Sequence, residues 1–242
     1  MAVRYGSTIK RDGLLFHLDA ANPKSYPGSG STWYDLSGNG NHFTLYNAPA
    51  WNSGGWFDFN GIDEYARSNN IIDASGGNYA IIEATFYNDP TKIMFVWELS
   101  SDWNANVGGC GLVVNSNGTG YASGLHHQNH KGGAEGRNFE APTTEGWFVS
   151  HQMFAGVADS TGTVSYLQGE QKNFPSTTYP GGTTSIDKQP VIRDDYWFIA
   201  SRNGTSTFFD GPIAGIKCYV GNKFTADDIK TNFIAVRSRY GI

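Results

Sequence analysis

The feature that most restricts the fold is a succession of short runs of β-prone residues, separated by turns rich in glycine and asparagine. Glycine accounts for 31 of the 242 residues, aromatic side chains for 14% and charged side chains for only 16%. Glycine and asparagine supply the backbone angles that tight turns need, and aromatic residues favour strands. These proportions exclude a coiled coil, a mainly helical protein and a charged disordered chain.

The runs predict an all-β fold of one domain. The pair Asn60-Gly61 directly follows one run and is a strong signal for a tight turn between antiparallel strands. Many short strands joined by turns are typical of a two-sheet antiparallel sandwich or jelly roll. We expect strands over residues 14–18, 56–59, 79–87, 93–99, 111–114, 147–154, 162–167, 196–200 and 213–220.

A single helix is predicted near the C-terminus. Thr225 is a typical N-cap residue, and Asp228 three positions later completes a capping box. Apolar residues follow at helical spacing on one face, namely Ile229, Phe233 and Val236. We therefore expect a short C-terminal helix that packs on the sandwich.

Several segments are distinctive when read as motifs. They are GLLFHLDAANPKSY at residues 13–26, WYDLSGNGN at 33–41, FNGIDEY at 59–65, WFVS at 147–150 and GPIAGIKCY at 211–219. Together with residues 224–233, they resemble the concanavalin A-like lectin/glucanase superfamily in its laminin G-like branch, of the type found in tailed-phage structural proteins. The resemblance extends over residues 13–242 and is strongest at both ends.

This resemblance implies two antiparallel sheets packed face to face in one jelly-roll domain over residues 13–242, preceded by an N-terminal arm over residues 1–12. It also implies a structural protein of a bacteriophage virion, such as a capsid decoration or a short fibre or tail accessory protein. The expected partners are other virion proteins, further copies of the chain as an oligomer, and glycans of the host surface. The expected location is the virion surface, after synthesis in the cytoplasm of the host bacterium.

The carboxylates are not spaced as in an enzyme. Glycosidases of the superfamily that this chain resembles place alternate carboxylates on one strand, so that both face the scissile bond. Here Glu83 stands alone in its run, whereas Asp194 and Asp195 are adjacent and would point to opposite faces of a strand. No Gly-x-Ser-x-Gly nucleophile motif occurs. We expect no enzymatic activity; a carbohydrate-binding lectin module is the alternative, and a glycosidase is a less favoured one.

Charge and hydropathy exclude further classes of partner. The net charge is -5, and no cluster of lysine and arginine is present to neutralise phosphates, so nucleic acid is not an expected partner. No apolar run approaches the roughly 18 residues of a membrane span, and residues 1–13 lack the apolar core of a signal peptide. Cys110 and Cys218 are expected to be buried as small apolar residues, with a disulfide between them as the alternative.

Two segments imitate metal sites. Residues 35–41, DLSGNGN, alternate oxygen-bearing side chains with a glycine at the sixth position, as the first half of an EF-hand does, but the twelfth position is Tyr46. We favour a turn whose side chains bond to their own backbone, with calcium as the alternative. His126, His127 and His130 carry imidazoles that could bind zinc or nickel. We favour no metal there, because residues 131–138 that follow are predicted to be an exposed loop. No cofactor is expected.

Aromatic residues beside Asn and Asp in predicted loops are candidates for binding. Such residues suit a glycan site, and they suit a protein interface equally well. The candidates are Asp102, Trp103, Asn104, His126, His130, Trp51 and Tyr179. Five tryptophans lie in strand-like sequence contexts, and we expect most of them in the core. They are Trp33, Trp56, Trp97, Trp147 and Trp197.

Overall fold

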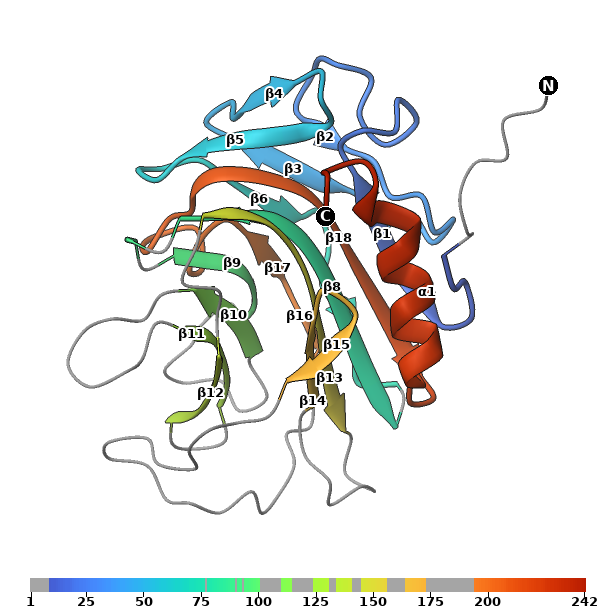
Figure 1. Ribbon diagram of the computed structural model, residues 1–242. Helices are drawn as coiled ribbons and strands as arrows, with labels where there is room; N and C mark the ends of the chain where they lie inside the picture. Colours follow the sequence, from blue (N-terminus) through green and yellow to red (C-terminus); the bar gives the residue numbers. More distant parts are fainter. Residues whose placement is uncertain are drawn as a thin grey trace.

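The computed structural model describes residues 9–76, 78–89, 91–92, 94–100, 110–114, 124–130, 134–140, 145–155, 164–172 and 194–242. In these residues, two antiparallel sheets of eight strands pack face to face, as predicted (Figure 1). For residues 124–130 and 134–140 the description covers the backbone.

The first sheet has the order β15 (Glu170–Lys172), β14 (Val164–Leu167), β13 (Gly146–Ala155), β8 (Tyr79–Asn88), β18 (Asp210–Gly221), β5 (Trp56–Asn60) and β4 (Ala50–Asn52), with β1 (Leu14–Asp19) also paired to β18. The second sheet has the order β12 (Ala134–Glu140), β11 (Gly124–His130), β10 (Cys110–Val114), β9 (Met94–Leu99), β17 (Trp197–Ile199), β6 (Tyr65–Ser68), β3 (Phe43–Tyr46) and β2 (Thr32–Trp33). A small ribbon joins β7 (Ile72–Asp73) to β16 (Asp194–Asp195).

Each predicted strand is present, and the structure adds short or polar strands that the pattern did not reveal. The prediction of a loop over residues 131–138 is wrong for its second part, because β12 pairs along its whole length with β11. The sequence of β12 is polar and contains glycine, so its strand conformation depends on this pairing and not on intrinsic propensity. Trp51 was also predicted in a loop, but it lies in β4.

The space between the sheets is filled with aromatic side chains. Trp33, Trp97 and Trp197 are fully buried there, as predicted. The ring centroid of Phe16, from the first sheet, lies 5.1 Å from that of Trp197, from the second. Trp56 and Trp147 are instead half-buried and pack against each other outside this core. Cys110 and Cys218 are both buried and free, which confirms the expectation for them.

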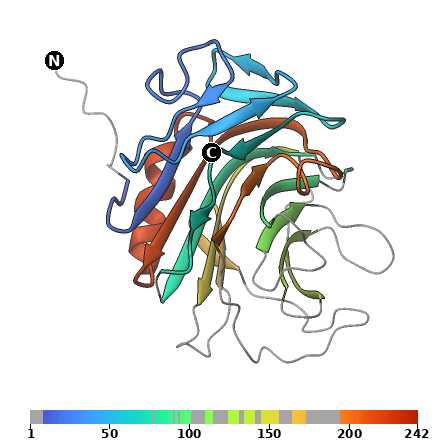
Figure 2. The same cartoon turned by 180° about the vertical axis from the view of Figure 1, so that it is seen from behind.

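The helix α1 (Ala226–Arg237) has the predicted capping box: the Thr225 hydroxyl accepts the Asp228 N–H at 3.2 Å, and the Asp228 carboxylate accepts the Thr225 N–H at 2.9 Å. The predicted apolar face is buried, and Phe233 and Val236 pack on Val149 of β13. The helix therefore covers the outer face of the first sheet, away from the second (Figures 1 and 2). It is neither long nor apolar enough to cross a membrane, and no other helix occurs in the described residues.

The end of the predicted N-terminal arm lies against α1. The backbone N–H of Lys10 donates to Asn232 Oδ1 at 2.9 Å, and its ammonium lies 2.8 Å from Asp228 Oδ1. The Asn232 amide in turn donates to the Tyr219 hydroxyl at 3.0 Å. These contacts tie the start of the described chain to the helix and to β18.

Candidate functional site

A row of side chains crosses the outer face of the second sheet, on the side opposite the core. Arg67 of β6 is in register with Thr44 of β3 and with Phe198 of β17, and Phe198 is in register with Glu98 of β9. Directly opposed residues in antiparallel strands project to the same face with neighbouring Cβ atoms. The sheet therefore brings Arg67 and Glu98 to either side of Phe198.

Three tyrosines surround Arg67 on this face. Tyr46 and Tyr65 are in register and stack with a centroid separation of 4.6 Å and an interplanar angle of 4°. The guanidinium carbon of Arg67 lies 5.4 Å from the Tyr46 ring centroid and 5.0 Å from that of Tyr196. Cation–π attraction to two rings restricts where the guanidinium can move. We call Tyr46, Tyr65, Arg67 and Tyr196 the tyrosine–arginine cluster.

The hydroxyl groups and the guanidinium of this cluster have no hydrogen bond or ion pair to the part of the protein that the structure describes. Within the described residues, none of the three tyrosine hydroxyls takes part in a hydrogen bond and Arg67 has no ion pair; its buried Nε also lacks a partner. All four residues are half-buried. Burial raises the pKa of Tyr65 above its usual value, so its hydroxyl remains a hydrogen-bond donor at neutral pH. The cluster thus presents donors that a ligand can satisfy.

Glu98 lies beneath this surface and is 0% exposed. One carboxylate oxygen accepts the backbone N–H of Asn203 at 2.5 Å, while the other has no partner in the described part of the chain. Burial raises the pKa of Glu98 to about 8, an effect that the bond from Asn203 and the charge of Arg202 only partly oppose. Glu98 is therefore mostly protonated and neutral at pH 7.

The turn that covers Glu98 also borders the cluster. Arg202 and Ser206 form an isolated bridge, and between them Gly204 has a φ of 65°. A Cβ on Gly204 would lie 2.9 Å from the Tyr65 ring, so only glycine allows the turn to approach the ring this closely.

The outer face of the first sheet carries a network of charged side chains that is buried. Lys217, Glu83 and His151 are in register on β18, β8 and β13 and are almost completely buried under α1. The Lys217 ammonium forms an ion pair with Glu83, and His151 Nε2 lies 3.1 Å from the second Glu83 oxygen. Burial by itself would raise the pKa of Glu83, but Lys217 and His151 hold it well below its usual range.

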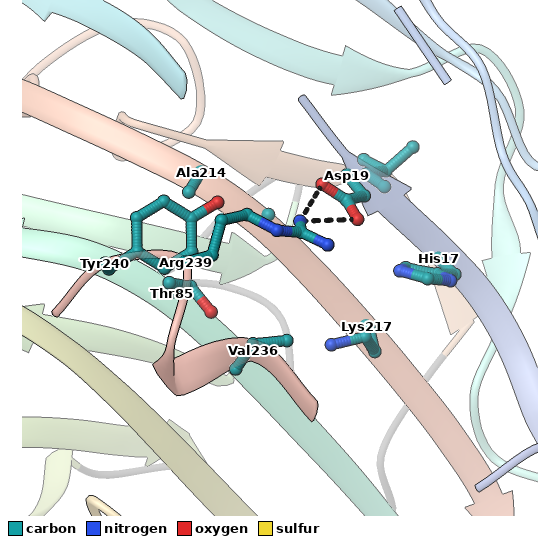
Figure 3. A pocket seen from close by; sticks show the side chains of 10 residues that line it. His17, Asp19, Thr85, Ala214, Lys217, Val236, Arg239 and Tyr240 are labelled. Atoms are coloured by element: carbon teal, nitrogen blue, oxygen red, sulfur yellow. Dashed lines mark hydrogen bonds and ion pairs between the residues drawn. The ribbon is translucent and has the colours of Figure 1, made fainter. Parts of the chain in front are cut away.

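A small pocket opens beside this network, between β1, β18 and the end of α1 (Figure 3). Arg239 closes one side and donates to both Asp19 oxygens, at 2.8 and 2.9 Å. Burial and the nearby Lys217 charge lower the pKa of His17, on its wall, to about 4. The cavity volume is about 10 Å³, room for roughly one water molecule. The pocket is too small for a sugar.

The segment over residues 35–41 is tied to β1 by its own side chains. One Asp35 oxygen accepts the N–H groups of His17 and Ser37, each at 2.8 Å, and the other accepts the Ser37 hydroxyl at 2.6 Å and the Asn41 N–H at 3.1 Å. The Asn41 amide donates to the Leu15 carbonyl at 2.9 Å. Among the described residues, no group of three His, Cys, Asp or Glu side chains is placed to hold a metal ion.

The predicted site residues do not form this cluster. Trp51 donates from its indole to the Ala20 carbonyl at 3.0 Å and packs on Tyr26, so it supports the edge of the first sheet. His126 and His130 belong to β11, in register with Val113 and Ala134. The remaining candidates lie outside the described residues, namely Asp102, Trp103, Asn104 and Tyr179.

None of the four residues of the tyrosine–arginine cluster was predicted from the sequence. A local signal was present, because Tyr65 and Arg67 are two residues apart and project to one face of β6, while Ala66 between them is buried. Which strands neighbour β6, and therefore which aromatic residues flank Arg67, does not follow from that alternation.

No protein-family model and no curated protein matches the sequence. Solved structures match it through the fold. Trypanosoma rangeli sialidase in complex with the inhibitor DANA is 14% identical with a TM-score of 0.60, over 97% of this chain and 34% of that one. The ligand binding domain of botulinum neurotoxin serotype D in complex with N-acetylneuraminic acid is 12% identical with a TM-score of 0.61, over 92% and 51%.

A third neighbour matches along its whole length. Domain 4 of AbnA, a GH43 extracellular arabinanase from Geobacillus stearothermophilus, in complex with arabinotriose, is 16% identical with a TM-score of 0.59, over 93% of this chain and 100% of that domain. By contrast, the chain spans about a third of the length of the sialidase. At this level of identity the likenesses show the fold alone, and they confirm a two-sheet antiparallel β-sandwich.

Proposed function

We propose that this protein is a non-enzymatic β-sandwich that binds glycans through the tyrosine–arginine cluster. The observation that carries the proposal is the half-buried set of tyrosine hydroxyls and the Arg67 guanidinium, which have no hydrogen bond or ion pair to the described protein. Ligand sites combine aromatic surface with a few polar groups that fix orientation. Tyrosine supplies both, because its ring contacts the C–H groups of a sugar while its hydroxyl bonds to sugar hydroxyls.

The fold neighbours support this proposal. The toxin domain and the arabinanase domain are described in complex with N-acetylneuraminic acid and with arabinotriose, respectively. A sandwich of this type therefore provides surfaces for sugars in other proteins, although the residues that do so belong to each protein separately.

The burial of the carboxylates supports a non-enzymatic role. A glycosidase places two carboxyl groups on either side of the bond it cleaves, where both reach the substrate. Glu98 and Asp195 are 0% and 3% exposed, and Glu83 is buried in its ion pair with Lys217. None of these three carboxyl groups reaches solvent as such a pair requires.

A glycan array followed by titration tests the proposal. We expect the protein to bind a subset of glycans, and Tyr46→Ala or Tyr65→Ala to weaken that binding about tenfold or more, because each removes one ring of the stacked pair. Tyr34→Ala is the matched control, since Tyr34 is exposed and packs edge-on against His42 outside the cluster. A silent array would contradict glycan binding, and release of sugar from bound glycans would contradict a non-enzymatic role.

A second candidate function is that of a bacteriophage virion component on the particle surface, as the sequence resemblance implies. The observation that favours it is the anchoring of Lys10 on α1, which gives the predicted arm a fixed point of departure from the sandwich. An arm held in this way can reach a neighbouring protein or a second copy of the chain.

Purification of phage particles tests the virion role. We expect the protein to sediment with virions at a constant copy number, and a variant that lacks residues 1–9 to be lost from the particles. Detection of the full chain only in the supernatant of a lysate would contradict this role and would leave glycan binding as the function to test.

A further inference from the structure

We propose that the tyrosine–arginine cluster selects glycans that carry a carboxylate, and that Arg67 is the residue that recognises this group. The inference rests on the proposed function, because it assigns the ligand class of the same surface. It makes a separate claim, namely that an acidic sugar binds there more tightly than its neutral counterpart.

The positive charge of Arg67 has no counter-ion among the described residues. The chain has an excess of acidic over basic residues, 22 to 17, yet no carboxylate of the described residues pairs with Arg67. The buried Lys217 has such a partner in Glu83, and the exposed Arg239 has one in Asp19. A guanidinium that keeps its charge and lacks a counter-ion is the group best suited to a carboxylate ligand, which it can bind through two parallel hydrogen bonds.

The Arg67 side chain is preorganised for binding. The rings of Tyr46 and Tyr196 lie 5.4 and 5.0 Å from the guanidinium carbon, so the side chain is already restrained before a ligand arrives. Less conformational entropy is then lost on binding. The buried Nε without a partner is a further sign of an unfilled site, because a buried donor that lacks an acceptor is costly and is usually satisfied by water or ligand.

Glu98 is the carboxyl group in the same row of side chains, and it does not offset the charge of Arg67. It is separated from Arg67 by Phe198, and its unbonded oxygen is buried. Since burial raises its pKa to about 8, Glu98 neither neutralises Arg67 nor repels a carboxylate ligand at pH 7. Glu98 therefore does not offset the charge of Arg67, in a protein whose net charge is -5.

Glucuronic acid and glucose provide the test, because they differ at C6 by a carboxylate in place of a hydroxymethyl group. We expect titration calorimetry or saturation-transfer NMR to give a dissociation constant for glucuronate at least about tenfold lower than for glucose at low salt. This ratio should fall in about 1 M salt, where ions screen the exposed part of the charge interaction. Arg67→Gln should bring the ratio close to one, and Arg67→Lys should leave an intermediate value.

The control is Arg237→Gln, which makes the same change of net charge at an exposed arginine that packs over Phe233 on α1. It should leave the glucuronate-to-glucose ratio as in the parent protein. Because the readout is a ratio within one variant, partial unfolding does not imitate the effect. Equal affinity for both sugars, or a ratio unaffected by Arg67→Gln, overturns the acidic preference alone. Absence of binding to either sugar, while neutral glycans still bind on the array, likewise overturns the acidic preference alone, whereas a silent array overturns it together with the proposed function.

Discussion

Replacing Glu83 by glutamine is expected to destabilise the protein by about 3–5 kcal/mol, because it leaves the buried ammonium of Lys217 without a counter-charge. The two residues are 134 positions apart in the chain but adjacent in the first sheet. His151 loses its partner as well, since its Nε2 lies 3.1 Å from the same carboxylate. Urea unfolding followed by tryptophan fluorescence measures the loss.

Glu170→Gln is the matched control. Glu170 forms a surface ion pair with Lys172 at 3.5 Å, and its side chain is 79% exposed, so the same substitution there should cost less than about 1 kcal/mol. The double variant Glu83→Gln/Lys217→Met should regain much of the lost stability, because it removes both buried charges. Equal costs for Glu83→Gln and Glu170→Gln would show that the buried pair contributes no more than a surface one.

The same network sets the acid limit of the fold. The folded pKa of Glu83 is depressed, so its contribution to stability is present above its unfolded pKa and is lost as the pH falls. For His17, with a folded pKa of about 4 against about 6.5 in the unfolded chain, stability is likewise lost as the pH falls from about 6.5 to 4. Both groups therefore weaken the native state in acid.

Glu98→Gln is expected to stabilise the protein in alkali. The ionisation of Glu98 weakens the native state as the pH rises, whereas Glu83 and His17 weaken it as the pH falls. The folded pKa of Glu98 is about 8 against 4.5 in the unfolded chain, so its stabilising contribution is complete below pH 4.5 and is lost as the pH rises through 8. At about 1.36 kcal/mol per pH unit, the loss is on the order of 4 kcal/mol. Glutamine carries no charge at any of these pH values and keeps an acceptor for the Asn203 N–H.

Unfolding free energies at pH 4 and pH 9 check this expectation. The parent and the variant should be similar at pH 4, whereas the variant should be several kcal/mol more stable at pH 9. Glu170→Gln, at an exposed position, should leave the pH dependence as in the parent. A parent and a Glu98→Gln variant with the same pH dependence would mean that the buried carboxyl group ionises without penalty.

Features that depend on neighbours in the sequence were predictable. The capping box of α1 involves Thr225 and Asp228, three residues apart, and its buried face follows from the spacing of Ile229, Phe233 and Val236. The strands that carry alternating or continuous apolar residues, such as β5 and β8, were found for the same reason. The polar strand β12 was missed, because only its hydrogen bonds to β11 make it a strand.

The sequence by itself therefore determined the class of fold, the position and start of α1, and the burial of Trp33, Trp97 and Trp197, since each is encoded in local periodicity and turn chemistry. Only the tertiary structure decided which polar residues meet. Tyr46 and Arg67 meet Tyr196, the residue directly before β17, because β3, β6 and β17 are neighbours in one sheet. Lys217, Glu83 and His151 meet because β18, β8 and β13 are neighbours in the other. Strand order and register depend on the packing of the whole core, which no short segment encodes.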